Sequence, residues 1–243
     1  MSVIYHLATL RCYIAKHKGE FMEHYKELSQ TKIFSYSSEF ECQAMMFCFK
    51  TRFVNFEKHQ TIVRQGDSME NVVLIVKGGA KIENMDSLGN INILMQLKAG
   101  DAYGLATAYA GDENYKDSLI ATEKTLVMFM NRYRLLNQCD NHCKRHEIVI
   151  KKINQMIAEN NIELQNKLMH LSKKTIREKL MSYFLTMTEK NKSTYFEIPY
   201  NVTELANYLA VDRSALSNEL GKMKKEGIID YDKCQYRLIK KKL

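Results

Sequence analysis

The chain has 243 residues, of which 45% are hydrophobic and 26% charged, a composition typical of a folded protein with room for two domains. These values exclude a disordered or low-complexity chain, and no apolar run reaches the roughly 18 residues that a membrane-spanning helix needs. The net charge of +8 is uneven, because residues 172–243 hold 15 Lys and Arg against 9 Asp and Glu, whereas residues 1–171 hold 21 against 19. A basic C-terminal segment on a near-neutral body indicates either a polyanionic partner or a solvated surface.

The N-terminus and the cysteines indicate the cellular compartment. Residues Met1–Ile14 lack the basic segment, the apolar run and the small-residue cleavage site of a secretory signal, so we expect a cytoplasmic protein. The six cysteines of such a chain are expected to be reduced thiols.

The first 49 residues mix acidic, basic and apolar residues without strand alternation, which favours helices. Ser38 precedes an apolar run at helical spacing, Phe40–Phe49, and Glu41 stands three residues after Ser38. Because this is the capping-box pattern, we predict a helix that begins directly after Ser38.

Residues 51–131 carry the pattern of a β-rich domain. Short runs of β-branched, aromatic and aliphatic residues are separated by turn signals such as Gly66-Asp67, Gly78-Gly79 and Gly100-Asp101. The predicted strands are Arg52–Phe56, Thr61–Val63, Val72–Val76, Ala80–Asn84, Ile91–Leu97 and Thr125–Met130. Strands this short, with turns about every 8–12 residues, predict a jelly-roll or barrel.

Two thiols and two imidazoles share one helical face just after this domain. Cys139, His142, Cys143 and His146 are spaced at i, i+3, i+4 and i+7, and zinc accepts such ligands. One helix rarely places four ligands around a tetrahedral ion, and the alternative is a helix entry with buried thiols and exposed imidazoles. We therefore predict no metal site here.

A long helix is predicted from about Cys143 to Leu171, where neither glycine nor proline occurs. Spacings of three and four residues, interrupted at Lys167, connect Ile150, Ile153, Ile157, Asn160, Leu164 and Leu171. This repeat predicts a parallel two-stranded coiled coil in a homodimer, with Asn160 paired to its symmetry mate. The alternative is a long helix that packs on its own domain.

The C-terminal stretch has the layout of a winged helix-turn-helix. After an amphipathic helix, Thr175–Thr188, and a loop with a short strand, Tyr195–Ile198, the segment Val202–Asp212 predicts a helix, a turn and a cap. The next helix, Arg213–Lys225, precedes a hairpin with its tip at Asp232-Lys233. A generic three-helix bundle would give the same apolar spacing, with Leu205, Ala206 and Leu209 on one face and Leu216, Leu220 and Met223 inward.

The outward face of the second helix suits DNA. Its predicted base and backbone contacts are Arg213, Ser214, Ser217, Asn218 and Lys222. Asn218 suits adenine, and Arg213 suits either guanine or phosphate. Further predicted phosphate contacts are Lys173, Lys174, Arg177, Thr203, Lys233 and Arg237.

From roughly Ile33 to the C-terminus, the chain resembles the Crp/Fnr family of bacterial transcription regulators. The resemblance rests on Ile62–Asp67, Val73–Ile82 and Leu97–Gly104 in the β-rich domain, and on Arg177 and Thr203–Ile229 in the C-terminal domain. It implies an α+β chain with three parts: an effector-binding β-roll in residues 1–142, a dimerisation helix in residues 143–171 and a winged helix-turn-helix in residues 172–243.

The resemblance also implies a function. A member of this family is a homodimer that binds palindromic double-stranded DNA and regulates transcription, with RNA polymerase as a further partner and no role at a membrane. The predicted effector residues are Tyr103, Gly104, Leu105, Ala106, Tyr115 and Lys116 in the β-roll, and Asn160, Asn161 and Glu163 on the long helix. The alternative for Asn160, Asn161 and Glu163 is that they are exposed to solvent or only set the register of the coiled coil.

The effector motif departs from that of the members that bind cyclic AMP. Those members place a glutamate for the ribose hydroxyl where this chain has Leu105, and an arginine and a small hydroxyl residue for the phosphate where it has about Tyr115 and Lys116. We therefore expect an unidentified small-molecule effector other than cyclic AMP, or activity without one. Cys12, Cys42 and Cys48 lack the close spacing of an iron–sulfur cluster, and the histidines form no haem pattern. The recognition helix departs as well, with Ser214 and Asn218 where many members carry glutamate and arginine, so we expect a different DNA half-site.

Two other function classes are alternatives for a chain with a β-rich domain. A metalloenzyme on a β-roll needs several histidines and a glutamate, whereas His59 is the only histidine in residues 51–131, so we predict no enzyme. A cyclic-nucleotide-type regulatory or scaffold protein without specific DNA binding is the remaining alternative, and the basic winged segment counts against it.

Overall fold

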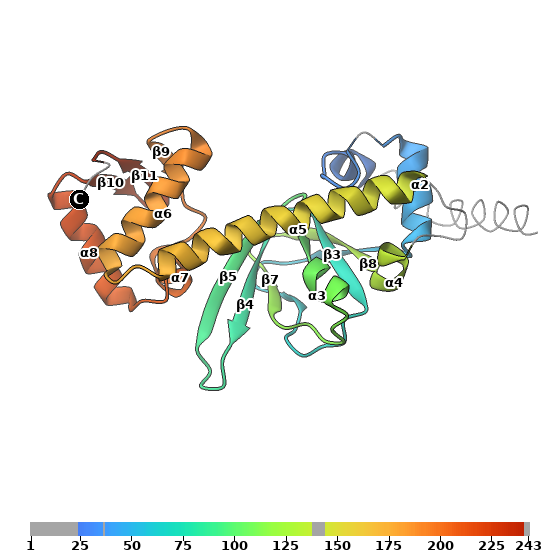
Figure 1. Ribbon diagram of the computed structural model, residues 1–243, viewed down its shortest axis with the longest axis horizontal. Coiled ribbons are helices and arrows are strands. Elements are labelled where there is room, and N and C mark those ends of the chain that lie inside the picture. The colour runs from blue at the N-terminus through green and yellow to red at the C-terminus, as the bar shows by residue number, and fades with distance from the viewer. Residues whose placement is uncertain (1–23, 36, 138–143, 241–243) are drawn as a thin grey trace, which may run out of the picture. The chain divides into compact units, whose positions relative to one another are not determined.

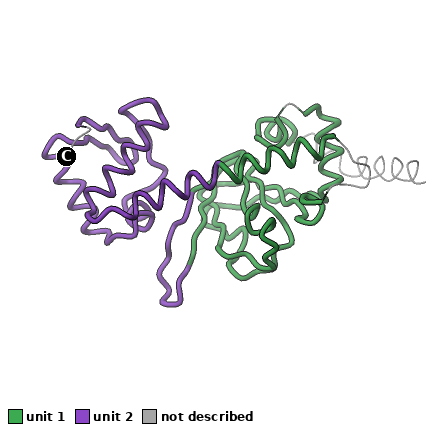
Figure 2. Tube along the Cα trace, in the orientation of Figure 1, with its two compact units in different colours: residues 1–84, 96–158 green, residues 85–95, 159–243 purple. Residues whose placement is uncertain are grey.

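The computed structural model describes residues 24–35, 37–137 and 144–240 (Figure 1). The chain divides into two compact units (Figure 2): residues 1–84 with 96–158, and residues 85–95 with 159–243. The division falls within the long helix and within one β-hairpin rather than at the boundaries that the sequence suggested.

The predicted capping box begins helix α2 (Glu39–Cys48). The Ser38 side chain accepts a hydrogen bond from the Glu41 backbone N–H, and the Glu41 carboxylate accepts one from the Ser38 N–H at 2.9 Å. The helix buries Cys42, Met45 and Met46. This confirms the prediction from the Ser38 pattern.

Unit 1 contains the predicted β-roll. One four-stranded sheet has the order β1-β8-β3-β6 and the other β2-β7-β4-β5. The strands are β1 (Arg52–Phe56), β2 (Thr61–Val63), β3 (Asn71–Lys77), β4 (Gly79–Met85), β5 (Ile91–Lys98), β6 (Ala102–Tyr103), β7 (Ser118–Ala121) and β8 (Thr125–Asn131). Six of these were predicted within two residues. β6 was missed, because two residues are too short to show a periodic pattern, and β7 was missed as well.

Two short helices complete the roll. α3 (Leu105–Ala110) lies between Gly104 and Gly111, whose φ angles of 88° and 78° are in the left-handed region that favours glycine. A Cβ atom at Gly104 would lie 2.7 Å from Cε of Met69, so the close packing there also requires glycine. α4 (Arg132–Leu136) follows β8 and is capped by Asn131.

The long helix α5 (Lys144–Leu171) has 28 residues, as predicted to within one residue. Its buried residues occupy one stripe: His146, Val149, Ile153 and Met156 in the part that belongs to unit 1, and Lys167 and His170 in the part that belongs to unit 2. The structure thus places Ile153, a predicted dimer residue, in the core of its own unit with no exposed surface.

Unit 2 contains the winged helix-turn-helix. Its elements are α6 (Ile176–Asn191), β9 (Tyr195–Glu197), α7 (Val202–Tyr208), α8 (Arg213–Lys225), β10 (Ile229–Asp232) and β11 (Gln235–Leu238), and the strands form a sheet in the order β10-β11-β9. The sheet rules out a bare three-helix bundle. The residues predicted to face inward, among them Leu205, Leu209, Leu216, Leu220 and Met223, form the apolar core.

In the described part of the chain, no helix combines the length and apolar character needed to cross a bilayer.

Candidate DNA-binding surface and effector region

Helix α8 is amphipathic, with one apolar face and one polar face. Leu216, Leu220 and Met223 are buried, and the exposed residues include Arg213, Ser214, Ser217, Asn218 and Lys222. The Asp212 carboxylate accepts a hydrogen bond from the Ala215 N–H at 2.8 Å and so caps the helix. Asp212, rather than Ser214, is thus the N-cap of α8. The exposed residues are the donors and acceptors that can reach base edges and phosphates.

Most of the other predicted phosphate contacts are exposed on the surface of unit 2. Lys173 and Lys174 precede α6, Thr203 lies on α7, and Lys233 stands at the turn between β10 and β11; all are exposed. Arg237 on β11 is also exposed, but its guanidinium lies 4.8 Å from the centre of the Tyr195 ring, a cation–π contact.

Arg177 is placed differently from the other cations. Its Nη1 and Nη2 donate to the two Glu226 carboxylate oxygens at 2.7 and 2.8 Å, and its Nε donates to Glu219 at 2.5 Å. These bonds raise the pKa of Arg177 and lower that of Glu226, the bond to Glu226 being the largest cause of each shift. Because Glu219 lies on α8 and Glu226 is its C-cap, Arg177 fastens α6 to α8. The sequence had suggested that Arg177 contacts a phosphate. In the structure its guanidinium donors bond to Glu219 and Glu226 instead.

The predicted effector residues of the β-roll form a filled aromatic region. The rings of Tyr103 and Tyr115 stack with centroids 5.7 Å apart and an interplanar angle of 15°. The Tyr103 hydroxyl donates to the Asp117 carbonyl at 2.7 Å, and the Tyr115 hydroxyl donates to the Asn71 carbonyl. Burial raises the pKa of Tyr115 to about 12, so this ring is neutral at physiological pH.

Packing around this pair also involves residues from the next helix and from the β2–β3 connection. Gly104 and Leu105 are buried beside the pair, whereas Ala106 is exposed. Met69, which is 1% exposed and packs on Gly104, was missed, since the sequence shows only an isolated apolar residue between turn signals. Tyr115 is thus an uncharged, buried ring whose hydroxyl is bonded within the β-roll.

Lys116 points away from this region. Its side chain is 61% exposed and its Nζ lies 3.0 Å from the Asp112 carboxylate. The cation considered as a substitute phosphate ligand is therefore paired at the surface.

The three predicted sensor residues of α5 belong to unit 2. Asn160 is half-buried and Asn161 is exposed, while the Glu163 carboxylate accepts a hydrogen bond from Lys190 on α6 at 2.5 Å. Glu163 thus joins α5 to α6 within this unit.

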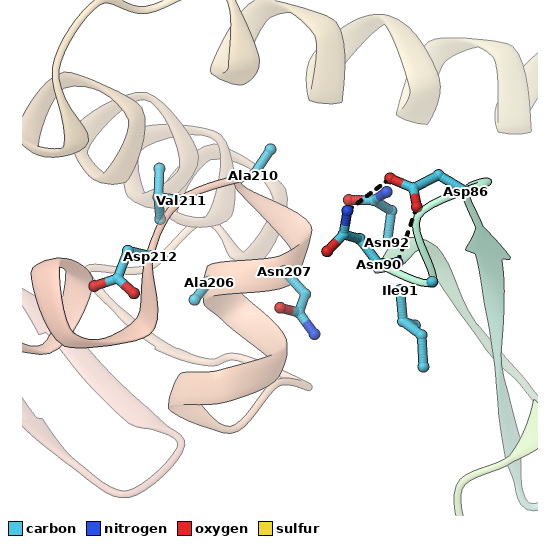
Figure 3. Close-up of a pocket in the computed structure, with 10 residues that line it drawn as sticks. Asp86, Asn90, Ile91, Asn92, Ala206, Asn207, Ala210, Val211 and Asp212 are labelled. Atoms are coloured by element: carbon cyan, nitrogen blue, oxygen red, sulfur yellow. Dashed lines mark hydrogen bonds between the residues drawn. The ribbon is translucent and has the colours of Figure 1, made fainter.

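A cleft of about 680 Å³ opens in unit 2 next to the start of α8. Its lining comes from the tip of the β4–β5 hairpin and from α7 with the following turn (Figure 3), and consists of Asp86, Gly89, Asn90, Ile91, Asn92, Ala206, Asn207, Ala210, Val211 and Asp212. No local pattern predicts this cleft, because its two walls are more than 100 residues apart in the chain.

The predicted Cys/His group can be placed only in part. Cys139, His142 and Cys143 lie outside the described residues. His146 is buried, with its ring edge-on to Phe49 at 5.1 Å between centroids. In residues 24–35, 37–137 and 144–240 no three His, Cys, Asp or Glu side chains gather as a metal site would require.

Two family models match the chain. Residues 53–142 match the cyclic nucleotide-binding domain, and residues 178–242 match the Crp-like helix-turn-helix domain. No curated protein sequence matches the chain.

Solved structures of the same fold cover most of this chain. FixK2 from Bradyrhizobium japonicum is 19% identical, with a TM-score of 0.62 over 79% of this chain and 93% of its own. CLP, a c-di-GMP-responsive global regulator of Xanthomonas campestris, is 11% identical, with a TM-score of 0.67 over 81% and 98%. A variant of CooA from Carboxydothermus hydrogenoformans is 16% identical, with a TM-score of 0.65 over 80% and 86%. At these identities the structures show the fold alone. The two family models, in this order and on this fold, show that the chain belongs to the Crp/Fnr family of transcription regulators.

Proposed function

We propose that the protein is a homodimeric, sequence-specific DNA-binding regulator of transcription that acts in the cytoplasm and is not an enzyme. The observation that carries this proposal is the outward face of α8, where Arg213, Ser217 and Asn218 are exposed on a helix that is capped at Asp212 and fixed to its core. RNA polymerase is a further proposed partner.

Sequence would be read by two side chains of this face. Asn218 can bond to the paired donor and acceptor of adenine, and Arg213 to guanine or to a phosphate. Lys173, Lys174, Thr203, Lys222 and Lys233 would hold the DNA backbone, with Ser214 and Ser217 beside them. A base contact predicts a loss upon alanine substitution that depends on the DNA sequence, whereas a phosphate contact predicts an equal loss on all sequences.

The long helix would supply the dimer interface. Because Ile153 and Lys167 are buried in their own units, the proposed seam uses the neighbouring stripe of α5. This stripe repeats at spacings of four and three and comprises Ile150, Asn154, Ile157, Asn161, Leu164, Leu168 and Leu171, all exposed or half-buried in the single chain. Asn161 rather than Asn160 would then pair across the dimer axis.

The β-roll would sense an effector other than cyclic AMP, or would act without one. The buried Tyr103–Tyr115 stack and the outward ion pair of Lys116 support this, because neither provides a cation for a cyclic phosphate. A change of state in the β-roll would reorient the two recognition helices until they match major grooves about one helical turn apart.

Selection of random duplexes by the purified protein, with and without cyclic AMP, tests the proposal. A palindromic motif recovered equally in both conditions is the expected result. Recovery only with cyclic AMP would contradict the proposed effector class. If no motif is enriched in either condition, the affinity of the protein for a random duplex should still fall steeply as the salt concentration rises. Absence of any DNA binding would refute the proposed function.

A further inference from the structure

The tip of the β4–β5 hairpin belongs to the same compact unit as the helix-turn-helix. Residues 85–95 group with residues 159–243 rather than with the rest of the β-roll (Figure 2). Ile93 is 1% exposed and lies in the apolar core that also contains Leu205 and Leu209 of the first helix-turn-helix helix. The hairpin therefore contributes a core residue to the DNA-binding unit.

Lys167 makes the polar part of this connection. Its Nζ donates to the Ile93 carbonyl and, at 3.3 Å, to the Leu94 carbonyl, and it lies 4.5 Å from the centre of the Tyr208 ring at the end of α7. One ammonium group thus joins α5, the hairpin and α7. All three partners are uncharged, and burial lowers the pKa of Lys167 to about 8.

This contact explains the interruption of the apolar repeat on α5. Lys167 stands where the sequence pattern expected another apolar residue, and it is only 8% exposed. An apolar residue there could fill the volume, but it could not satisfy the two strand carbonyls. The exposed seam residues, Leu164 and Leu168, flank it on the helix, so Lys167 serves a separate contact.

Local hydrogen bonds order the tip of the hairpin. The Asp86 carboxylate accepts hydrogen bonds at 2.9 Å from the backbone N–H groups of Leu88 and Asn90 and from the Asn90 amide (Figure 3). Gly89 completes the turn at a φ angle of 82°. The tip is therefore a pre-ordered loop that lines the cleft in front of α7.

We propose that residues 85–95 act as a strap that holds α7 and α8 in the conformation that binds DNA, and that Lys167 is the positioning residue that fastens the strap. The inference rests on the proposed function in DNA binding. Since a released strap leaves α7 and α8 freer to move, the cost of ordering them would be paid on binding DNA.

A tryptophan reporter can observe the strap directly, because the chain contains no tryptophan. Ile91 lines the cleft and is 47% exposed, so Ile91→Trp places a single fluorophore beside α7. In this background we would compare Lys167→Met and Ile93→Ala with Lys151→Met, which removes an exposed lysine from the same helix. Circular dichroism verifies that each variant is folded.

We expect Lys167→Met and Ile93→Ala to shift the emission to longer wavelength and to raise the dissociation constant for the selected operator about tenfold. The Lys151→Met control should leave the emission unchanged. Unchanged emission in both strap variants would refute the strap, and a shifted emission with unchanged operator affinity would refute its role in DNA binding. If the parent protein binds no DNA, the proposed function fails, while the emission still decides whether the strap exists.

Discussion

The Arg177 cluster gives the sharpest distinction between a phosphate contact and a residue that positions the recognition helix. The guanidinium uses Nε, Nη1 and Nη2 on Glu219 and Glu226, at 2.5, 2.7 and 2.8 Å. Replacement by methionine removes these bonds and leaves two carboxylates beside the DNA-binding face. To separate this charge change from the loss of the connection, we would use the double variant Arg177→Met with Glu226→Gln, which keeps the net charge.

The magnitude follows from the number of phosphates that each side chain neutralises. On B-DNA, the slope of log affinity against log salt concentration changes by about 0.9 for each phosphate contact, hence about 1.8 for both subunits on a palindrome. We expect the double variant to weaken binding at every salt concentration and to leave the slope unchanged. Lys222→Met, which removes a side chain that is 66% exposed, should make the slope shallower by about 1.8.

The assay is fluorescence anisotropy with one operator duplex at about 50–200 mM salt. The slope of the unmodified protein is the reference. If the double variant makes the slope shallower by the same amount as Lys222→Met, Arg177 contacts phosphate in the complex and our interpretation of the ion pairs is wrong. A melting experiment provides an independent readout, since loss of the α6–α8 connection should lower the melting temperature, whereas loss of a phosphate contact should not.

Four further outcomes are expected. Asp212→Ala should lower the unfolding free energy by about 1 kcal/mol and weaken DNA binding, because the first turn of α8 loses its cap. Asp212→Asn keeps a cap acceptor and should change both quantities little. If melting and binding experiments show that the two variants lose equally, the capping role is contradicted. Leu168→Glu should dissociate the dimer in sedimentation experiments without unfolding the chain, because this side chain is 67% exposed, and an intact dimer would exclude the proposed seam. The unfolding free energy of the protein should rise between about pH 8 and 10.5 relative to that of Lys167→Met, since in this range Lys167 keeps its proton in the unfolded chain and has released it in the folded one. Chemical unfolding across this range measures the difference. Plots of unfolding free energy against pH that run parallel for the two proteins would argue against a lowered pKa of Lys167. Millimolar cyclic AMP should leave the melting temperature unchanged, whereas a concentration-dependent increase would reveal binding by mass action.

The pattern of the sequence was sufficient for elements whose signals are local. The Ser38–Glu41 capping box, the 28-residue extent of α5 and the inward faces of α7 and α8 depend on spacings of three or four residues, and the structure has them where they were predicted. The strands of the β-roll with clear turns were found for the same reason, whereas β6 and β7 were not.

The long helix shows where this reasoning stops. Apolar and polar residues at heptad spacing occur on two adjacent stripes of α5, one through Ile153 and one through Asn154, and both begin at Ile150. Periodicity cannot choose between them, because each satisfies the same local rule. The stripes share four residues and differ at the others: Ile153 and Lys167 of the first stripe are buried in their own units, whereas Asn154, Asn161 and Leu168 of the second are exposed.

Local patterns were enough to predict the order of the parts, the family and the outward polar face of α8, since these depend on residues that are neighbours along the chain. The tertiary structure alone decided that Arg177 bonds to Glu226, that Lys167 bonds to the Ile93 and Leu94 carbonyls, and that Tyr115 turns inward onto Tyr103. These partners are between 12 and 74 residues apart. A charged or aromatic side chain offers the same local pattern whether it faces DNA, an effector or its own core, and only the packing of distant elements determines which of these it meets.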